Sequence, residues 1–549
     1  MNRRRLLRAL PAAAIAVSEF APAQEGPELS KDALKSALGM IGLSFRDAQL
    51  EQMRGNAARM ARGFAALRAL PLPNDVTPAF YFDPLPAGRK PPAPAPFVPP
   101  APRVAGRFRE LEEVAFWPLP ELAALIRSRR VTSTALTKMY LDRLRRHGDT
   151  LHCVVTLTES LALEQAARAD AELKRGRYRG VLHGIPYGAK DLFATKGIRT
   201  TWGAEPYRDQ VIDLDATVIT KMAEAGAVLA AKLSMGALAM GGLWFGGMTR
   251  TPWNLDKTSS GSSAGSAAAT AAGLLPFALG TETLGSILTP SRICGVTGLR
   301  PTFGRVSRHG AMALCWTMDK IGPICRTAED AMLVLRAIEG PDGKDRTVAA
   351  RPLGWNAAAP ARGLRVAYVA ADFERLTGER KARAEEALAA LRKAGLDPRP
   401  VKLPEFPTDA LITILSAEAA AAFDALTRDG GVDQLSGQRD GDWPNQFRSA
   451  RLLPAVEYIQ AMRARTLLIQ EMDAWMAPWD VVVTPSASRM LVITNFTGHP
   501  QMSVPSGFVD GEPEAIHFTG RLYEEGKMAR AAHAFQQATR WHRERPAGF

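Results

Sequence analysis

The stretch 258–305 constrains this chain most, because two loops of small residues flank an apolar segment rich in alanine. The loops are Ser259–Ser266 and Gly280–Ser286, and the segment between them predicts a helix running into a buried strand at Leu274–Leu279. Small side chains leave backbone N–H groups uncovered, and a serine in such a loop becomes a nucleophile when a base is near. A flexible linker has a similar composition, but this tract runs directly into Ala267–Ala272, which favours a packed helix.

Three segments carry a resemblance to a known family. They are SGSSAGS at 260–266, GTETLGS at 280–286 and CGVTGLRPTFGRVS at 294–307. Together they resemble the defining signature of the amidase signature family of serine hydrolases, whose two loops read Gly-Gly-Ser-Ser-Gly-Gly-Ser and Gly-Thr-Asp-x-Gly-Gly-Ser. The resemblance covers about residues 115–546 and is densest over 181–330. It implies an α/β fold in which helices cover both faces of a large mixed central sheet.

The resemblance also assigns catalytic roles. Lys190 matches the family's catalytic lysine, Ser262 its bridging serine and Ser286 its nucleophile. The two serines are 24 residues apart (286 − 262), which agrees with the family's spacing. A cis peptide bond is expected between Gly261 and Ser262. The backbone N–H groups expected to form the oxyanion hole are those of Thr283, Leu284, Gly285 and Ser286.

Elementary chemistry is consistent with a lysine as the base. A neutral serine needs a group that takes its proton, and the eight histidines form no GxSxG-type Ser-His-Asp motif. His183 and His499 are expected to be structural or to line a pocket. Lys190 closes an apolar run, where burial lowers a lysine pKa, and we expect Asp191 and small residues around it. Taken alone, a lysine beside an aspartate is more often a surface ion pair, and a lone serine more often caps a helix.

The implied function is an amidase that hydrolyses the C–N bond of a carboxamide or small amide. Ser286 would carry the acyl-enzyme, with Ser262 and Lys190 as the proton relay and without a metal or cofactor. Two alternatives are a GatA-like glutaminase subunit of a tRNA-dependent amidotransferase and a catalytically silent binding protein. The expected partner is a small-molecule amide, and a homodimer is left open.

The chain departs from the family signature at five positions. They are Ser260, Ala264, Glu282, Leu284 and Leu288. Leu284 adds bulk beside the oxyanion and is expected to narrow the acyl pocket. Leu288 stands where the family commonly has arginine, which removes a charge that can pair with the loop acid or a substrate carboxylate. We therefore expect an uncharged or apolar acyl group rather than a dicarboxylate.

Charge and cysteine content exclude several other classes. The formal net charge is +13, but Lys and Arg are scattered, which indicates a solvated basic surface rather than a nucleic-acid site. The four cysteines follow no CxxC or Cys/His spacing, so a zinc site is not expected.

The N-terminus resembles an export signal. Residues 1–23 contain Arg3-Arg4-Arg5, a short apolar run and the small-x-small sequence Ala21-Pro22-Ala23, which predicts twin-arginine export to the periplasm or medium. Glu19 within the apolar run fits an ordinary basic N-terminus instead, which would leave the protein cytoplasmic. Elsewhere no run of eighteen apolar residues predicts a membrane span.

Composition divides the rest of the chain into three parts. Residues 24–85 predict a helical extension, with an apolar face over Leu34–Leu70, that is weakly similar to the small GatC-type subunit of amidotransferases. Residues 86–109 form a proline-rich linker. Residues 110–546 would be the amidase signature domain, where strands and helices alternate as in an α/β sheet. Within it, 181–330 is the core and 340–480 a variable region that shapes the substrate entrance. The last helix is expected over about Glu525–Glu544.

Overall fold

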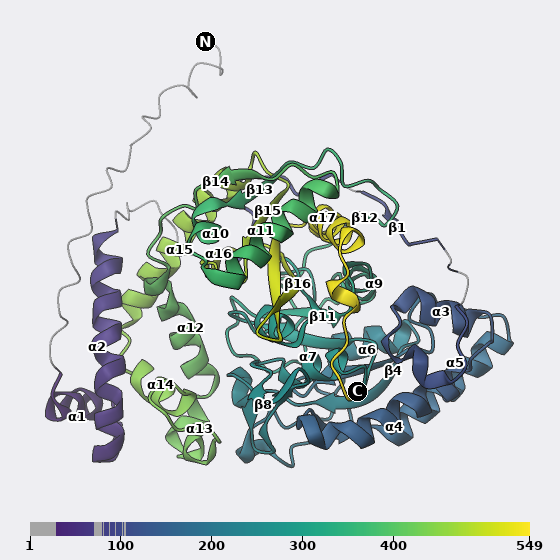
Figure 1. Cartoon of the computed structure of the whole chain (residues 1–549). Helices are drawn as coiled ribbons and strands as arrows, with labels where there is room; N and C mark the ends of the chain where they lie inside the picture. Colours follow the sequence, from purple (N-terminus) through teal and green to yellow (C-terminus); the bar gives the residue numbers. More distant parts are fainter. Residues whose placement is uncertain are drawn as a thin grey trace, which may run out of the picture.

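One large mixed sheet forms the centre of the molecule. The computed structural model describes residues 29–70, 80, 82–86, 88–93, 95–101, 103 and 106–549. The sheet has 11 strands in the order β14-β13-β15-β17-β16-β10-β11-β9-β3-β4-β2, and helices lie on both of its faces (Figure 1). In that order the strands are Arg399–Val401, Val366–Val369, Val481–Pro485, Glu512–Gly520, Gln501–Val509, Thr297–Arg300, Lys320–Cys325, Ala278–Glu282, Pro186–Lys190, Val228–Leu233 and Val154–Leu157. The α/β fold expected from the sequence is confirmed.

The strand directions bring three chain segments to one edge of the sheet. β3 is parallel to both β4 and β9, with Gly188 opposite Ala278, while β11 is antiparallel to β9, with Lys320 opposite Glu282. The carboxyl ends of β3 and β9 and the amino end of β11 therefore meet at one edge. Lys190 is the last residue of β3, so this edge holds the candidate site.

Helices surround the sheet. In the first half they are α1 (Lys31–Met40), α2 (Asp47–Ala69), α3 (Leu119–Arg127), α4 (Ser133–Leu151), α5 (Glu159–Lys174), α6 (Thr217–Glu224), α7 (Ala264–Ala271) and α8 (Leu288–Cys294). In the second half they are α9 (Ala328–Ile338), α10 (Ala370–Glu374), α11 (Gly378–Lys393), α12 (Thr408–Ala422), α13 (Asp424–Arg428), α14 (Trp443–Ala450), α15 (Ala455–Met476), α16 (Met490–Thr497) and α17 (Glu525–Ala538). The apolar cluster around α7 and β9 is the main core.

Three boundaries differ from the expectation. The strand expected at Leu274–Leu279 begins only at Ala278, because α7 ends at Ala271 and a turn separates the two elements. The helical face over Leu34–Leu70 is two helices, since the chain turns at Gly42 with a φ of +72°. The last helix ends at Ala538 rather than Glu544, and a short turn of 3-10 helix at Trp541–Arg543 follows.

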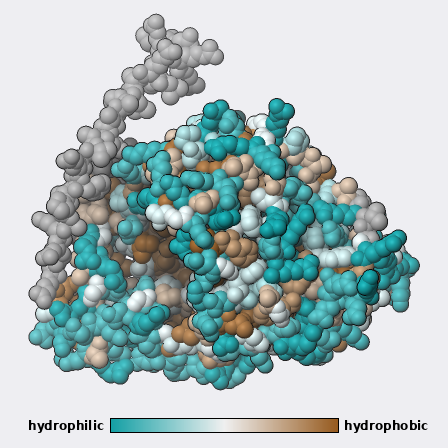
Figure 2. Space-filling model, viewed as in Figure 1, coloured by the Kyte–Doolittle hydropathy of each residue, from teal (hydrophilic) through white to brown (hydrophobic). Residues whose placement is uncertain are grey.

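The N-terminal helices lie against the region that was expected to shape the substrate entrance. α2 runs beside α12 and α14 (Figure 1) and also contacts α15. Leu67 of α2 is buried in one apolar cluster with Leu411 of α12 and Met472 of α15. On the face drawn in Figure 2, apolar side chains gather in a recess between these helices and the rest of the molecule.

Part of the proline-rich segment pairs with the folded body. Phe97 and Val98 form a two-residue strand, β1, which pairs in parallel with Trp355 and Asn356 of β12. This stretch is therefore tied to the domain rather than a free spacer.

No helix within the described residues is long and apolar enough to cross a membrane. The expected export signal, 1–23, lies outside those residues.

Candidate active site

Lys190 is buried at the end of β3 with hydroxyl groups around its amine. Its Nζ lies 2.8 Å from Ser262 Oγ and 2.8 Å from Thr281 Oγ1. Burial lowers the pKa of Lys190 to about 7, although the more distant Asp319 and Glu282 carboxylates oppose the shift. A substantial fraction of the amine is therefore neutral near neutral pH, as a general base requires.

The carboxylate of Asp191 does not lie beside the Lys190 amine, which corrects the expectation from the sequence. It faces the other way, where Oδ1 forms an ion pair with Lys232 at 3.1 Å and Oδ2 accepts from the backbone N of Thr201 at 2.8 Å. Successive side chains of a strand point to opposite faces, which separates two adjacent residues at the strand end. This pairing leaves Lys190 without a carboxylate partner among the residues that the structure describes.

The loop before α7 places Ser262 beside the amine. The peptide bond between Gly261 and Ser262 is cis, as expected from the resemblance, and Ser262 is buried. Ser260, where the family has glycine, has a φ of +58°, so serine here adopts a conformation that glycine reaches more easily. Ala264, the other replaced glycine, starts α7 and is fully buried.

Ser263 joins the two signature loops, a role that the sequence reasoning missed. Its backbone N donates to the carbonyl of Ser286 at 3.1 Å, its Oγ donates to the carbonyl of Thr281 at 3.1 Å, and the same oxygen accepts from Thr281 N. Ser286 is half-buried and lies directly against the Ser262–Ser263 pair through this bond. Its Oγ makes no hydrogen bond to another described residue, so the structure joins Ser262 directly to Lys190 but not to Ser286 through their side chains.

The loop 283–286 presents unengaged backbone amides. Within the described chain, no hydrogen bond is donated by the N–H groups of Thr283, Leu284, Gly285 or Ser286. Gly285 has a φ of +96°, a region that a residue with a side chain rarely adopts. Such a row of free donors is suited to a developing oxyanion.

The carboxylate of Glu282 accepts hydrogen bonds from the backbone just after this loop and from two side chains outside it. Its Oε2 accepts from the backbone N of Ile287 at 2.9 Å and of Leu288 at 3.0 Å. Its Oε1 accepts from Arg300 Nη1 at 2.7 Å and from Asn495 Nδ2 at 2.9 Å. Burial opposes the charged form, but Arg300 and the other donors outweigh it and lower the pKa of Glu282 to about 2.

This arrangement corrects the expectation for Leu288. The loop acid has not lost its cationic partner, because Arg300, at the end of β10, supplies the charge from another strand. Both side chains are fully buried. Arg300 belongs to the GLRP segment and Glu282 to the GTET segment, and both segments lie inside the signature. The contact between the two side chains could not be deduced from their spacing along the chain.

A cavity of about 330 Å³ lies beside the oxyanion loop, lined by Thr281 and Thr283 but not by Lys190, Ser262 or Ser286. Its lining includes Leu192, Thr281, Thr283, Met312, Asp319 and Lys320. Thr283 Oγ1 donates to Asp319 Oδ1 at 2.5 Å, and Asp319 Oδ2 accepts from the backbone N of Leu314 and Cys315. Asp319 therefore fixes the cavity wall to the loop that bears the free amides.

The histidines named from the sequence are placed away from these groups. His183 Nε2 is paired with the carbonyl of Ala169 at 3.0 Å, and His499 Nδ1 with Thr497 Oγ1 at 2.8 Å. Both are buried, and burial together with Arg300 and Arg521 lowers the pKa of His499 to about 3. Both are structural, in agreement with the expectation.

Comparison with known proteins identifies the family. The Amidase family profile matches residues 135–492. The A-type subunit of the glutamyl-tRNA(Gln) amidotransferase from Marinobacter nauticus is 34% identical over 483 residues, which cover 78% of this chain and 98% of that protein. This chain belongs to the Amidase family.

Solved structures agree with that assignment. The peptide amidase of Stenotrophomonas maltophilia superposes with a TM-score of 0.71 at 29% identity and covers 80% of this chain and 99% of its own. An amidase family protein of Bacillus anthracis superposes with a TM-score of 0.72 at 26% identity and covers 79% and 93%. As a member of the Amidase family, this protein hydrolyses amide C–N bonds.

Proposed function

We propose that this amidase acts through an acyl-enzyme on Ser286, with Ser262 and Lys190 as the proton relay. The observation that carries the proposal is the buried amine of Lys190, 2.8 Å from Ser262 Oγ and without a carboxylate partner among the described residues. The free amides of 283–286 support it, because they lie next to the proposed nucleophile.

During acylation, protons pass from Ser286 through Ser262 to Lys190, and the relay runs in the opposite direction when the leaving group departs. The neutral Lys190 amine accepts the Ser262 hydroxyl proton, Ser262 Oγ accepts the proton of Ser286, and Ser286 Oγ attacks the carbonyl carbon. The free amides of this loop are available to hold the oxyanion, and the loss of one such donor typically costs about 10²–10³ in rate. When the C–N bond breaks, the Lys190 ammonium returns its proton through Ser262 to the leaving nitrogen. Water then hydrolyses the ester by the same relay.

Thr281 is a positioning residue in this scheme. Its hydroxyl and carbonyl face Lys190 Nζ at 2.8 and 3.5 Å, so they orient the amine while Ser262 exchanges protons with it. Oriented hydroxyls fix the direction of the amine lone pair without adding the charge that would raise its pKa.

The cavity favours an uncharged acyl group. Leu192, Met312 and Ile321 supply apolar lining. In the inner wall, Arg308 pairs with Asp345 at 2.9 Å, and burial lowers the pKa of Lys320 well below its usual range. The exposed Lys344 and Arg346 also line the cavity, so the preference for an uncharged acyl group applies to its inner, apolar part.

A fluorophosphonate probe tests the proposal, since it phosphorylates an activated serine. We expect one adduct per chain on Ser286 in the wild type and none in the Ser286→Ala variant, measured by intact mass and peptide mapping. Ser449→Ala, a buried serine distant in sequence from the site, is the matched control and should label normally. A wild-type protein that hydrolyses no amide and takes up no probe would support the silent binding protein instead.

A panel of amides tests the substrate. Hexanamide and benzamide should be hydrolysed with a higher kcat/KM than L-glutamine or succinamic acid. A second candidate function, the glutaminase subunit of an amidotransferase, is favoured by the similarity to the Marinobacter amidotransferase protein. Release of ammonia from L-glutamine faster than from neutral amides would support that candidate over ours.

A further inference from the structure

A second cavity, of about 390 Å³, lies at the opposite edge of the sheet. We call it the C-terminal cavity; its lining includes Phe116, Glu121, Arg326, His533, Arg543 and Arg545. Arg326 follows β11 directly, whereas Lys320 at the start of the same strand lines the cavity beside the active site. Six residue steps along a strand separate the two cavities by roughly 20 Å.

Arg326 is a buried cation without an anionic partner in the described part of the chain. Only 6% of it is exposed, and it forms no ion pair with a described residue. Nη2 donates to the carbonyls of Thr270 and Ala271, whereas Nε is buried without a hydrogen-bond partner in the described structure. Because buried charges in proteins are normally paired, this guanidinium is suited to an anionic ligand.

The surrounding charges strengthen that preference for an anion. Arg326 lies over the ring of Phe116 with its Cζ 4.4 Å from the centroid, and Arg545 lies over the same ring at 4.6 Å. Burial lowers the pKa of Arg326 to about 10; the positive charges of Arg545 and Arg143 act in the same direction, while Tyr140 and the Asp330 carboxylate oppose the shift. Glu121 and Glu329, which also line the cavity, are both engaged by Arg103 at 3.2 and 2.7 Å.

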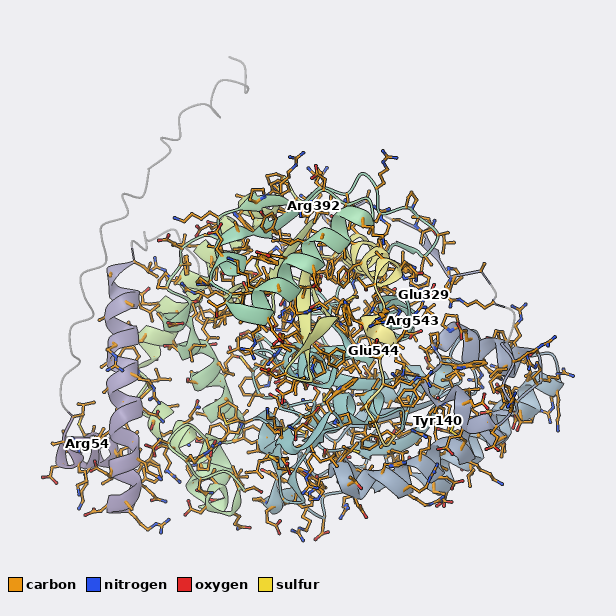
Figure 3. All side chains as sticks on the ribbon, in the orientation of Figure 1. Arg54, Tyr140, Glu329, Arg392, Arg543 and Glu544 are labelled. Carbon is orange, nitrogen blue, oxygen red and sulfur yellow. The ribbon has the colours of Figure 1, made fainter. Side chains whose placement is uncertain are left out.

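The remaining lining can accept or donate hydrogen bonds. Arg543 pairs with no carboxylate among the described residues and lies near Glu329 beside the C-terminal segment (Figure 3). The Nδ1 atoms of His533 and His542 are buried without partners in the described chain. Besides Arg103 and the two glutamates that it engages, three arginines and two histidines, whose pKa values are lowered by burial, therefore line this cavity.

We infer that the C-terminal cavity binds a small anion that carries phosphate or carboxylate groups, separate from the active site. Guanidinium groups bind both oxyanions through paired N–H donors, and an anion in this cavity would offset the positive charge of Arg326 and Arg545, which both line it. The site is independent of the proposed chemistry on Ser286.

The test is calorimetric titration of the full chain with inorganic phosphate and with citrate, at constant ionic strength against sodium chloride. We expect saturable binding of at least one of these anions, with a Kd below about 1 mM. Phosphate alone would identify a phosphate-bearing ligand and citrate alone a carboxylate-bearing one.

Two variants locate the site. Arg545→Gln changes an exposed side chain and should weaken binding at least tenfold, while the matched control Arg540→Gln, on a residue that pairs with Glu544 outside the cavity lining, should not. Ser286→Ala should bind the anion normally, so failure of the proposed catalysis leaves this test intact. The inference is overturned if neither anion binds beyond the chloride control, or if Arg545→Gln binds as tightly as wild type.

Discussion

At the scale of single residues, the signature indicated the groups of the proposed relay but not the residues that contact them. Lys190 and Ser262 are 2.8 Å apart, as the resemblance required. Thr281 and Arg300 were missed because their roles arise from contacts across strands, which spacing along the chain does not encode. Asp191 was misplaced for a simpler reason: alternation along β3 turns it to the opposite face, a point that the sequence itself could have indicated.

Arg300 provides a prediction at this scale. Arg300→Leu should lower stability by about 3–5 kcal/mol and abolish amidase activity, because it leaves the buried Glu282 carboxylate uncompensated behind the oxyanion loop. Urea unfolding and amide hydrolysis measure the two effects. Arg292→Gln removes a partly exposed arginine that is 3.4 Å from Glu514, and should change stability by about 1 kcal/mol or less. Equal effects of the two substitutions would refute this role for the Arg300–Glu282 pair.

At the scale of elements, the two signature loops are positioned by close backbone packing. Gly265 N donates to the carbonyl of Ser234 at 2.9 Å, and Ser263 ties the loops to each other. The helix and the strand of this region were predicted, but the strand start was misplaced because an apolar run of this length fits a turn as well as a strand.

Gly265→Ala tests that packing. A Cβ at this position would lie 2.5 Å from the carbonyl oxygen of Cys153 and 2.6 Å from the N of Ser234, so the loop must move. We expect a loss of about 1–3 kcal/mol in stability together with a large loss of kcat. Gly55→Ala, in α2 with no atom within 4 Å of the new Cβ, should instead stabilise by about 0.5–1 kcal/mol. Thermal unfolding separates the two, and an unperturbed kcat in Gly265→Ala would contradict this account.

At the scale of the whole molecule, α2 supports one wall of the cavity beside the oxyanion loop. α2 packs on α12 and α15, and these helices hold the segment 315–317 through Glu418 and Arg465. The sequence predicted helices here, but their docking surface is formed by residues about 350 positions later in the chain, which no local pattern could indicate.

Leu67→Ala measures this support. Removing a buried side chain from the cluster shared by α2, α12 and α15 should cost about 2–5 kcal/mol and lower the melting temperature. Met40→Ala, at a side chain that is 90% exposed, is the control and should change stability by less than about 0.5 kcal/mol. An unchanged melting temperature in Leu67→Ala would show that α2 is only loosely attached.

Export is a separate prediction for the whole chain. We propose that residues 1–23 are removed after Ala23 during twin-arginine export. Expressed with its own N-terminus, the protein should be recovered outside the cytoplasm with the mass of a chain that starts at Gln24. The double variant Arg3→Lys, Arg4→Lys should block both export and cleavage. An intact N-terminus on all of the protein would indicate a cytoplasmic enzyme.

The most direct test of the proposed relay is the pH dependence of kcat/KM for a neutral amide, measured with wild type and with Lys190→Met. Only the neutral amine accepts a proton, and the pKa of Lys190 is lowered to about 7, so activity should fall as pH decreases through that value. We predict a loss of about tenfold per pH unit well below pH 7, a plateau above about pH 8, and no measurable activity in Lys190→Met at any pH. A flat profile from pH 5 to pH 9 (about two units either side of neutrality), or a Lys190→Met variant as active as wild type, would contradict the account.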